Sequence, residues 1–381
     1  MFRPVVFAAP RPLVRFVSVA ASLGLALGLS ACSSGPASFP VTTDASPSAT
    51  PEPVYVTAPL TGVPYLEGSN AFLAGPAVMG KIDNSPGARP QAGLNQTDVV
   101  FDEMVEGGLT RFLAVWHSQL PADAGPIRSV RPMDPDIATQ FGGIIAYSGG
   151  QRPFVAAMQA SGIYNATETS EQVKKGIHRV TDRVAPHNLF LAAQQLAGEH
   201  PDLVAPKPLF SFLSDSNDAG PVAASLQGKD ALQVKAQFPA ATAIWDWSAK
   251  SGQWLRTQDG LRHLDATDGK QIHATNVVVL RVAIDRSFKD PRYGFVPKTV
   301  LDGTGTGVAF GGGKALEIKW SKAGLKAPIV LTDLSGSALS LLPGNTWFEL
   351  VPTDVGKVTI KYLASSATPS SSASPSATAK K

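Results

Sequence analysis

Apolar and polar positions follow two different patterns in the two halves of the chain. Between residues 77 and 147 the apolar residues form short runs, which are typical of strands buried on both faces. The predicted strands are Ala77–Ile82, Val99–Val105, Phe112–Trp116 and Gly143–Tyr147. Helical patterns alternate with them at Asp134–Phe141, Pro153–Ala160 and Asn188–Ala197. This alternation predicts a mixed α/β domain over residues 59–206.

From residue 220 to residue 363 apolar and polar residues alternate instead, and helical patterns are scarce. Glu317-Ile318-Lys319-Trp320 and Val358-Thr359-Ile360-Lys361 have the period of two that half-buried strands show. The predicted strands are Leu232–Phe238, Ala243–Trp247, Gln253–Thr257, Val277–Ile284, Leu316–Trp320, Thr346–Val351 and Lys357–Tyr362. Asp302–Gly307 is interpreted as a glycine-rich turn. The predicted fold class is α+β, with a mainly antiparallel β-rich domain following the mixed α/β domain.

The start of the chain has the layout of a secretory signal. Arg3, Arg11 and Arg15 precede the apolar run Phe16–Leu29, which is shorter than the ~20 residues of a bilayer span. The run ends in Leu29-Ser30-Ala31-Cys32, which resembles a bacterial lipobox. We predict a signal peptide over residues 1–31 and a lipid on Cys32, which would hold the protein at the extracytoplasmic face of the bacterial membrane. The alternative is a plain secretory signal with an incidental cysteine.

Two further segments and the overall charge narrow the class of protein. Residues 32–58 and 364–381 are rich in Ser, Thr, Pro and Ala, so we expect a disordered linker and a disordered tail. The chain has 33 basic and 30 acidic residues, and three of the basic ones lie in the predicted signal peptide. The mature charge is therefore near zero, which argues against nucleic acid as a partner. Cys32 is the only cysteine, so no intramolecular disulfide can form.

Several multi-residue blocks occur in a fixed order along residues 59–363. They include Ala88-Arg89-Pro90-Gln91, Glu106-Gly107-Gly108-Leu109-Thr110-Arg111, Gly125-Pro126-Ile127-Arg128-Ser129-Val130-Arg131-Pro132, Ala185-Pro186-His187-Asn188 and Pro343-Gly344-Asn345-Thr346-Trp347. With these blocks the chain resembles the YerB-like family of bacterial lipoproteins. The resemblance covers nearly all of the body and implies an N-terminal and a C-terminal YerB-like domain on a lipoprotein anchor. It implies no particular activity.

Three arginines within 21 residues, Arg111, Arg128 and Arg131, form the first candidate site. Each lies beside a turn, and the planar guanidinium fork binds phosphate and carboxylate through two parallel hydrogen bonds. We therefore expect the three side chains to converge on one anionic ligand. The alternative is that they form structural ion pairs with carboxylates at strand ends, namely Asp98, Asp102, Glu103 and Glu106.

A second group consists of His187 and Asn188. Asn188 could cap the predicted helix, and His187 could meet an anion there or act as a general acid or base. The plainer alternative is a helix cap and a histidine that hydrogen-bonds a neighbouring loop. Asp98, Glu103 and Glu106 could pair with the arginines or hold a divalent cation beside a phosphate, although their spacing is not specific to metal. No cofactor or metal is expected.

These features favour a membrane-anchored binding protein for an anionic glycan or phosphate of the cell envelope. One alternative is a metal-assisted phosphotransferase or hydrolase acting on an envelope polymer precursor. Asp98-Val99-Val100 and Ala146-Tyr147-Ser148-Gly149-Gly150 loosely resemble the LytR-CpsA-Psr phosphotransferases in this respect. The other alternative is an envelope scaffold that binds another protein. Whether the protein is an enzyme stays open at this level.

Overall fold

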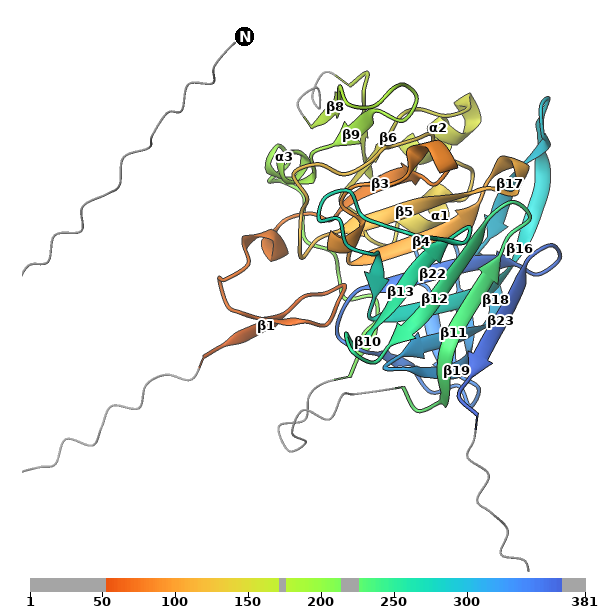
Figure 1. The fold of residues 1–381 in the computed structure, drawn as a ribbon. Helices are drawn as coiled ribbons and strands as arrows, with labels where there is room; N and C mark the ends of the chain where they lie inside the picture. The colour runs from red at the N-terminus through yellow and green to blue at the C-terminus, as the bar shows by residue number, and fades with distance from the viewer. Residues whose placement is uncertain (1–52, 171–175, 214–225, 365–381) are drawn as a thin grey trace, which may run out of the picture. The chain divides into compact units, whose positions relative to one another are not determined.

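The computed structural model describes residues 53–170, 176–213 and 226–364 (Figure 1). The predicted signal peptide, Cys32, most of the predicted linker and the tail from residue 365 lie outside the described residues. None of the helices in the described ranges is long and apolar enough to cross a membrane.

The N-terminal half contains short strands and a few short helices. Its strands are β1 (Tyr55–Thr57), β2 (Pro64–Leu66), β3 (Val78–Asp83), β4 (Val99–Met104), β5 (Thr110–Trp116), β6 (Ile144–Tyr147), β7 (Tyr164–Thr167), β8 (Ile177–Arg179), β9 (Leu189–Leu191) and β10 (Ser211–Phe212). Its α-helices are α1 (Asp134–Ala138), α2 (Arg152–Gln159) and α3 (Ala193–Gly198). Single 3₁₀ turns are η1 (Ala71–Ala74), η2 (Pro86–Ala88), η3 (Leu94–Gln96) and η4 (Glu106–Gly108).

The described part of the C-terminal half is built from strands. They are β11 (Lys229–Gln237), β12 (Thr242–Ser248), β13 (Gln253–Gln258), β14 (Leu261–Arg262), β15 (His273–Ala274), β16 (Asn276–Asp290), β17 (Gly294–Val300), β18 (Gly303–Gly311), β19 (Lys314–Lys322), β20 (Val330–Asp333), β21 (Ser340–Leu341), β22 (Thr346–Pro352) and β23 (Lys357–Tyr362). The predicted strands of both halves are confirmed, with ends that differ by a few residues.

One mixed sheet runs through both halves of the chain. Its strands follow the order β7-β6-β3-β5-β4-β22-β16-β18-β19-β20. The junction is the parallel pair β4 and β22, in which Val99–Glu103 lies beside Thr346–Leu350. The halves therefore share backbone hydrogen bonds along a central strand pair, and we call this pair the seam.

A second, antiparallel sheet of β23, β11, β12 and β13 packs against the seam (Figure 1). Trp245 of β12 contacts Trp347 of β22, with ring centroids 5.2 Å apart. On the opposite face Phe101 stacks on Phe348 at 4.6 Å, beside residues of α1 and α2. Because both faces are covered, every residue of β3, β4 and β22 is buried, which explains why apolar residues predominate in these strands.

The fold class needs correction. The protein is mostly β with a large mixed sheet, rather than a balanced α+β arrangement of a mixed α/β domain and a β domain. The predicted helix from Asn188 begins only at Ala193, because residues 189–191 pair with β8 as strand β9. Asn188 therefore caps no helix.

The glycine-rich stretch that was interpreted as a turn is a strand, β18. A Cβ on Gly305 would lie 2.5 Å from Trp320 Nε1, and one on Gly307 would lie 2.4 Å from the Val279 carbonyl oxygen. Glycine is needed there because neighbouring strands approach too closely for a side chain, and this packing reason cannot be read from the local sequence.

Candidate functional site

A cleft of about 500 Å³ opens at the carboxyl ends of β3 and β4. Its lining includes the three predicted arginines together with Asp83, Glu106 and Tyr293. The structure thus brings Arg111, Arg128, Arg131 and Glu106 to one place. We call it the arginine cleft.

Two turns place the arginines at the carboxyl ends of β3 and β4. The turn η4 joins β4 to β5 and places Arg111 at the second position of β5; Gly107 in this turn has a φ of 69°, which favours glycine. The loop that carries Arg128 and Arg131 is fixed by backbone hydrogen bonds from Arg128 N to the Lys81 carbonyl, 2.7 Å, and from Val130 N to the Gly149 carbonyl, 3.0 Å. The loop therefore runs alongside the end of β3.

Two of the three arginines are paired with carboxylates. Arg131 Nε lies 2.8 Å from Glu106 Oε2, and each side chain is 11% exposed. Arg128 Nε lies 3.1 Å from Asp83 Oδ2, with 28% of the arginine side chain exposed. Structural ion pairing thus accounts for these two charges within the protein.

Arg111 differs, since among the described residues no carboxylate forms an ion pair with it. Its Nη1 donates to the Ser129 carbonyl at 2.9 Å, and the same oxygen accepts from Arg131 Nη1 at 3.2 Å. Burial, and then the neighbouring charge of Arg131, lower the pKa of Arg111 to about 10, against the attraction of Asp83 and Glu106. The environment therefore leaves the Arg111 charge incompletely compensated.

A buried ion cluster lies beneath the cleft. Lys81 Nζ contacts Glu103 Oε1 and lies 2.8 Å from Asp134 Oδ1, and all three side chains are fully buried. Burial lowers the pKa of Lys81 to about 8, against the attraction of Asp134. Asp134 Oδ2 also accepts the backbone N–H of Arg131. Glu103 thus contacts Lys81, and this cluster supports the floor of the cleft.

His187 stands behind the cleft. Its Nδ1 lies 3.0 Å from Asp83 Oδ2, so the Asp83 carboxylate bridges His187 and Arg128. A carboxylate facing Nδ1 favours the tautomer with the proton on Nδ1. His187 therefore orients Asp83 and belongs to the cleft through this carboxylate.

Two candidate residues lie elsewhere. Asp98 is at the opposite end of β4, where its carboxylate accepts from Ser118 N at 2.7 Å and from Ser118 Oγ at 2.6 Å. Burial raises the pKa of Asp98 to about 6. Asn188 Oδ1 accepts from Arg179 Nη1 at 2.7 Å, on the surface. The structure brings neither residue to the arginine cleft.

The acidic residues do not form a metal centre in the described ranges. No group of three or more His, Cys, Asp or Glu side chains gathers there in a way that could hold a metal ion. Glu103 and Glu106 contact Lys81 and Arg131, respectively. These carboxylates therefore act as partners of cations in this structure.

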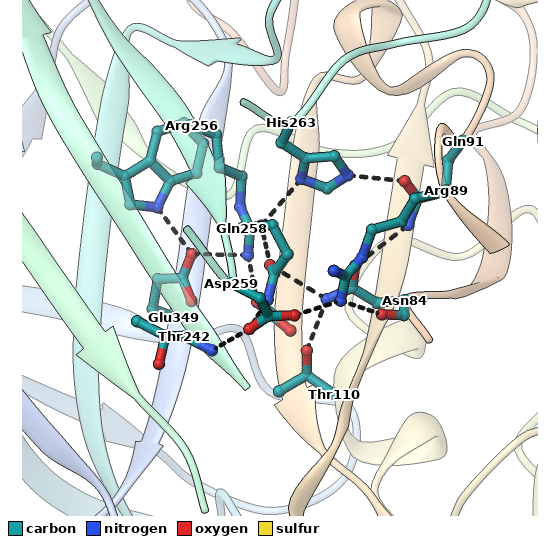
Figure 2. Close-up of polar contacts among 12 residues, drawn as sticks. Asn84, Arg89, Gln91, Thr110, Thr242, Arg256, Gln258, Asp259, His263 and Glu349 are labelled. Atoms are coloured by element: carbon teal, nitrogen blue, oxygen red, sulfur yellow. Dashed lines mark hydrogen bonds and ion pairs between the residues drawn. The ribbon is translucent and has the colours of Figure 1, made fainter. Parts of the chain in front are cut away.

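A polar network joins Gln91, His263, Arg256 and Glu349 (Figure 2). Gln91 Nε2 donates to the Asp83 carbonyl at 2.8 Å, and Gln91 Oε1 lies 2.7 Å from His263 Nε2. His263 Nδ1 lies 3.1 Å from Arg256 Nη1 and accepts from it, because a guanidinium can only donate. Burial and Arg256 lower the pKa of His263, so this histidine is neutral and donates through Nε2.

Arg256 of β13 packs against the centre of the seam. Its guanidinium carbon lies 5.1 Å from the ring centroids of both Phe112 and Trp347. It contacts Asp102 Oδ2 and lies 3.5 Å from Glu349 Oε1, and these two carboxylates are direct register partners across β4 and β22. Burial, and then the charge of Glu349, raise the pKa of Asp102 well above its usual range. One guanidinium thus serves two carboxylates, which favours a protonated Asp102.

Some residues around the cleft were not found from the sequence. Lys81 had a recognisable signal, because a lone lysine inside the apolar run Ala77–Ile82 requires a buried partner. Asp83 comes directly after that run. Tyr293 had no local signal, because it lies more than 150 residues from the arginines and reaches the cleft through the β16–β17 hairpin.

Comparisons with known proteins agree with this architecture. Residues 60–203 match the N-terminal domain, and residues 234–348 the C-terminal domain, of the family described as Protein of unknown function (DUF3048). The chain belongs to the DUF3048 family.

A relative in Bacillus subtilis (strain 168) carries the name "Putative lipoprotein YerB". It is 25% identical over 277 residues, which cover 71% of this chain and 80% of that protein. The crystal structure of the YerB protein from Bacillus subtilis matches with a TM-score of 0.66 at 22% identity, over 80% of this chain and 99% of that chain. The predicted resemblance to the YerB-like family is confirmed, and the crystal structure shows the same fold.

Proposed function

We propose that this protein is a lipid-anchored extracytoplasmic binding protein that holds an anionic ligand in the arginine cleft. Arg111 is the central contact, while Arg128 and Arg131 form the walls. His187 and Asp83 position Arg128. The lipid would be attached to Cys32, in keeping with the lipobox-like sequence and with the name of the Bacillus subtilis relative.

The observation that carries this proposal is the state of Arg111. A guanidinium that is partly buried, lowered in pKa and close to a second guanidinium gains stability when an anion arrives. Within the described ranges the Arg111 side chain bonds only to a backbone carbonyl, so its other N–H groups can meet two oxygens of one ligand. Arg128 and Arg131 lack this property because carboxylates already face them.

A titration of the full chain with dimethyl phosphate and with acetate tests the proposal. We expect NMR shifts of the Arg111 side chain with at least one of the two anions, and weaker binding at higher salt. Arg111→Gln should abolish the response. Arg262→Gln is a matched control, because Arg262 is exposed and its side chain donates to Gln271. Equal responses in wild type and Arg111→Gln would exclude the arginine cleft as the site.

The anchor is tested separately. Cys32→Ala should move the protein from the membrane fraction to the soluble fraction, because acyl chains supply the membrane affinity. Retention of the variant in membranes would contradict the lipid on Cys32.

A further inference from the structure

The shape and charge of the arginine cleft identify a class of anion. We propose that the ligand is a sugar carrying a single negative charge, with its two-oxygen anionic group on Arg111 and its ring against Tyr293. This inference rests on the proposed function, because it concerns the same cleft. A phosphodiester and a carboxylate both provide the required anionic group.

The charge balance of the site favours a single negative charge. Five cationic side chains lie in or directly beneath the cleft, and five carboxylates accompany them: Lys81, Arg111, Arg128, Arg131 and Arg292 against Asp83, Glu103, Glu106, Asp134 and Asp290. The pairing is uneven, since Lys81 contacts two carboxylates while Arg111 is paired with none among the described residues. One negative charge on the ligand would therefore give Arg111 the ion-pair partner that it lacks. A second charge on the ligand would face Asp83, Glu106 and Asp290, which line the same cleft.

Tyr293 supplies an apolar wall at the rim. It lies at the tip of the β16–β17 hairpin and is 55% exposed. Its ring runs along the glycine turn, since Tyr293 Cε1 lies 3.7 Å from where a Cβ on Gly107 would be. The exposed ring thus offers an apolar surface beside a strongly polar site, which suits a ligand that has both an apolar face and polar groups.

The hairpin tip is fixed in place. Asp290 Oδ1 accepts the backbone N–H groups of Arg292 and Tyr293, both at 2.9 Å. Phe288 packs edge-on against Phe154 of α2 with centroids 5.3 Å apart. Gln151 Nε2 lies 3.3 Å from Asp290 Oδ2. Tyr293 is therefore held over the cleft, with amide and carboxylate groups nearby that can meet sugar hydroxyls.

The volume supports a ligand larger than the anionic group. A cleft of about 500 Å³ lies within the usual range of small-molecule sites, whereas one phosphate or carboxylate fills only a fraction of it. A sugar ring placed between Arg111 and Tyr293 fills the remainder. Stacking of the ring on an aromatic face and pairing of the charge with a guanidinium are both available in this arrangement.

Calorimetric titration of the full chain tests the inference. The probes are glucosyl methyl phosphate and methyl glucuronide, their sugarless counterparts dimethyl phosphate and acetate, neutral methyl glucoside, and glucose 1-phosphate. We expect at least one singly charged sugar to bind roughly tenfold tighter than its sugarless counterpart and than methyl glucoside. The first two probes distinguish a phosphodiester from a carboxylate.

The variant Tyr293→Ala should remove that tenfold gain and leave the affinity for the sugarless anion unchanged. Tyr55→Ala is the matched control, because Tyr55 is 61% exposed and lies in β1. Equal affinity with and without the sugar, an unaffected Tyr293→Ala variant, or tighter binding of the doubly charged glucose 1-phosphate at pH 7.5 would overturn the inference while leaving anion binding intact. If no probe binds, the sugarless anions included, the proposed function fails as well.

Discussion

Arg111 stands directly opposite Asp83 across the antiparallel β3–β5 ladder, yet the Asp83 carboxylate contacts Arg128 and His187 instead. This arrangement leaves Arg111 without a carboxylate partner among the described residues of the arginine cleft. Asp83 is held by two partners at the end of β3, so it attracts Arg111 without forming an ion pair with it. The guanidinium of Arg111 depends on the Ser129 carbonyl, which it shares with Arg131.

The seam predicts that the two halves unfold together. Because β22 lies between β4 and β16 in one sheet, separating the halves breaks a central row of backbone hydrogen bonds. We expect a single calorimetric transition for the full chain, with equal calorimetric and van't Hoff enthalpies. Residues 53–213 expressed alone should not fold. Two transitions, or a folded fragment, would instead support independent domains over residues 59–206 and 220–363.

Two variants at the centre of the seam should differ in how much they change the free energy of unfolding. Arg256→Met should lower the free energy of unfolding by about 3–5 kcal/mol, because it leaves the Glu349 carboxylate buried without a counter-charge. Asp102→Asn should change it by only about 1 kcal/mol, since burial already favours the neutral acid and asparagine has the same shape. Urea unfolding at pH 7 measures both. Equal losses would contradict a protonated Asp102.

The floor of the cleft depends on Lys81. Lys81→Met should cost about 3–5 kcal/mol of unfolding free energy, because Glu103 and Asp134 lose their buried partner. Lys298→Met is the matched control: Lys298 lies 3.1 Å from Asp136 in a pair that is 31% and 18% exposed, so its loss should cost about 1 kcal/mol or less. Similar stability of the two variants would show that the buried cluster contributes little.

The raised pKa of Asp98 predicts the direction in which the stability of the protein changes with pH. The pKa of Asp98 is raised from 3.8 to about 6 in the folded protein, so the folded state binds this proton more tightly than the unfolded state. The contribution of Asp98 to stability therefore falls as the pH rises from about 4 to about 6. Relative to Asp98→Asn, the wild type should lose at most roughly 3 kcal/mol over this range. Asp202→Asn, at an exposed position, is the control. A difference independent of pH would contradict the raised pKa.

Local patterns were sufficient for most strands and for the arginines. Val99–Met104 and Thr110–Trp116 could be predicted because buried strands require apolar residues, and the turn between them requires glycine at Gly107. Arg111, Arg128 and Arg131 were recognisable because they lie close in sequence and beside turns.

Pairing over long distances could not be predicted in the same way. The β4–β22 pair joins residues about 250 positions apart, and apolar strands carry no mark of which neighbour they choose. The same holds for Tyr293 and for the contact of Asp83 with His187, since tertiary structure alone brings them together. Residues 189–191 became a strand because β8 was available as a partner, which overrode their helical pattern.

The most direct test of the central claim is the melting temperature of the wild type and of Arg111→Gln, each with and without saturating dimethyl phosphate or acetate. A ligand at 100 times its Kd stabilises the folded state by about 2.7 kcal/mol. We predict that the wild type gains this stability with one of the anions and that Arg111→Gln gains none. Without ligand, the variant should melt no lower than the wild type, because glutamine keeps a donor for the Ser129 carbonyl and removes the repulsion with Arg131. An Arg111→Gln protein that is stabilised like the wild type, or that melts well below it without ligand, would show that Arg111 is a structural residue rather than the centre of an anion site.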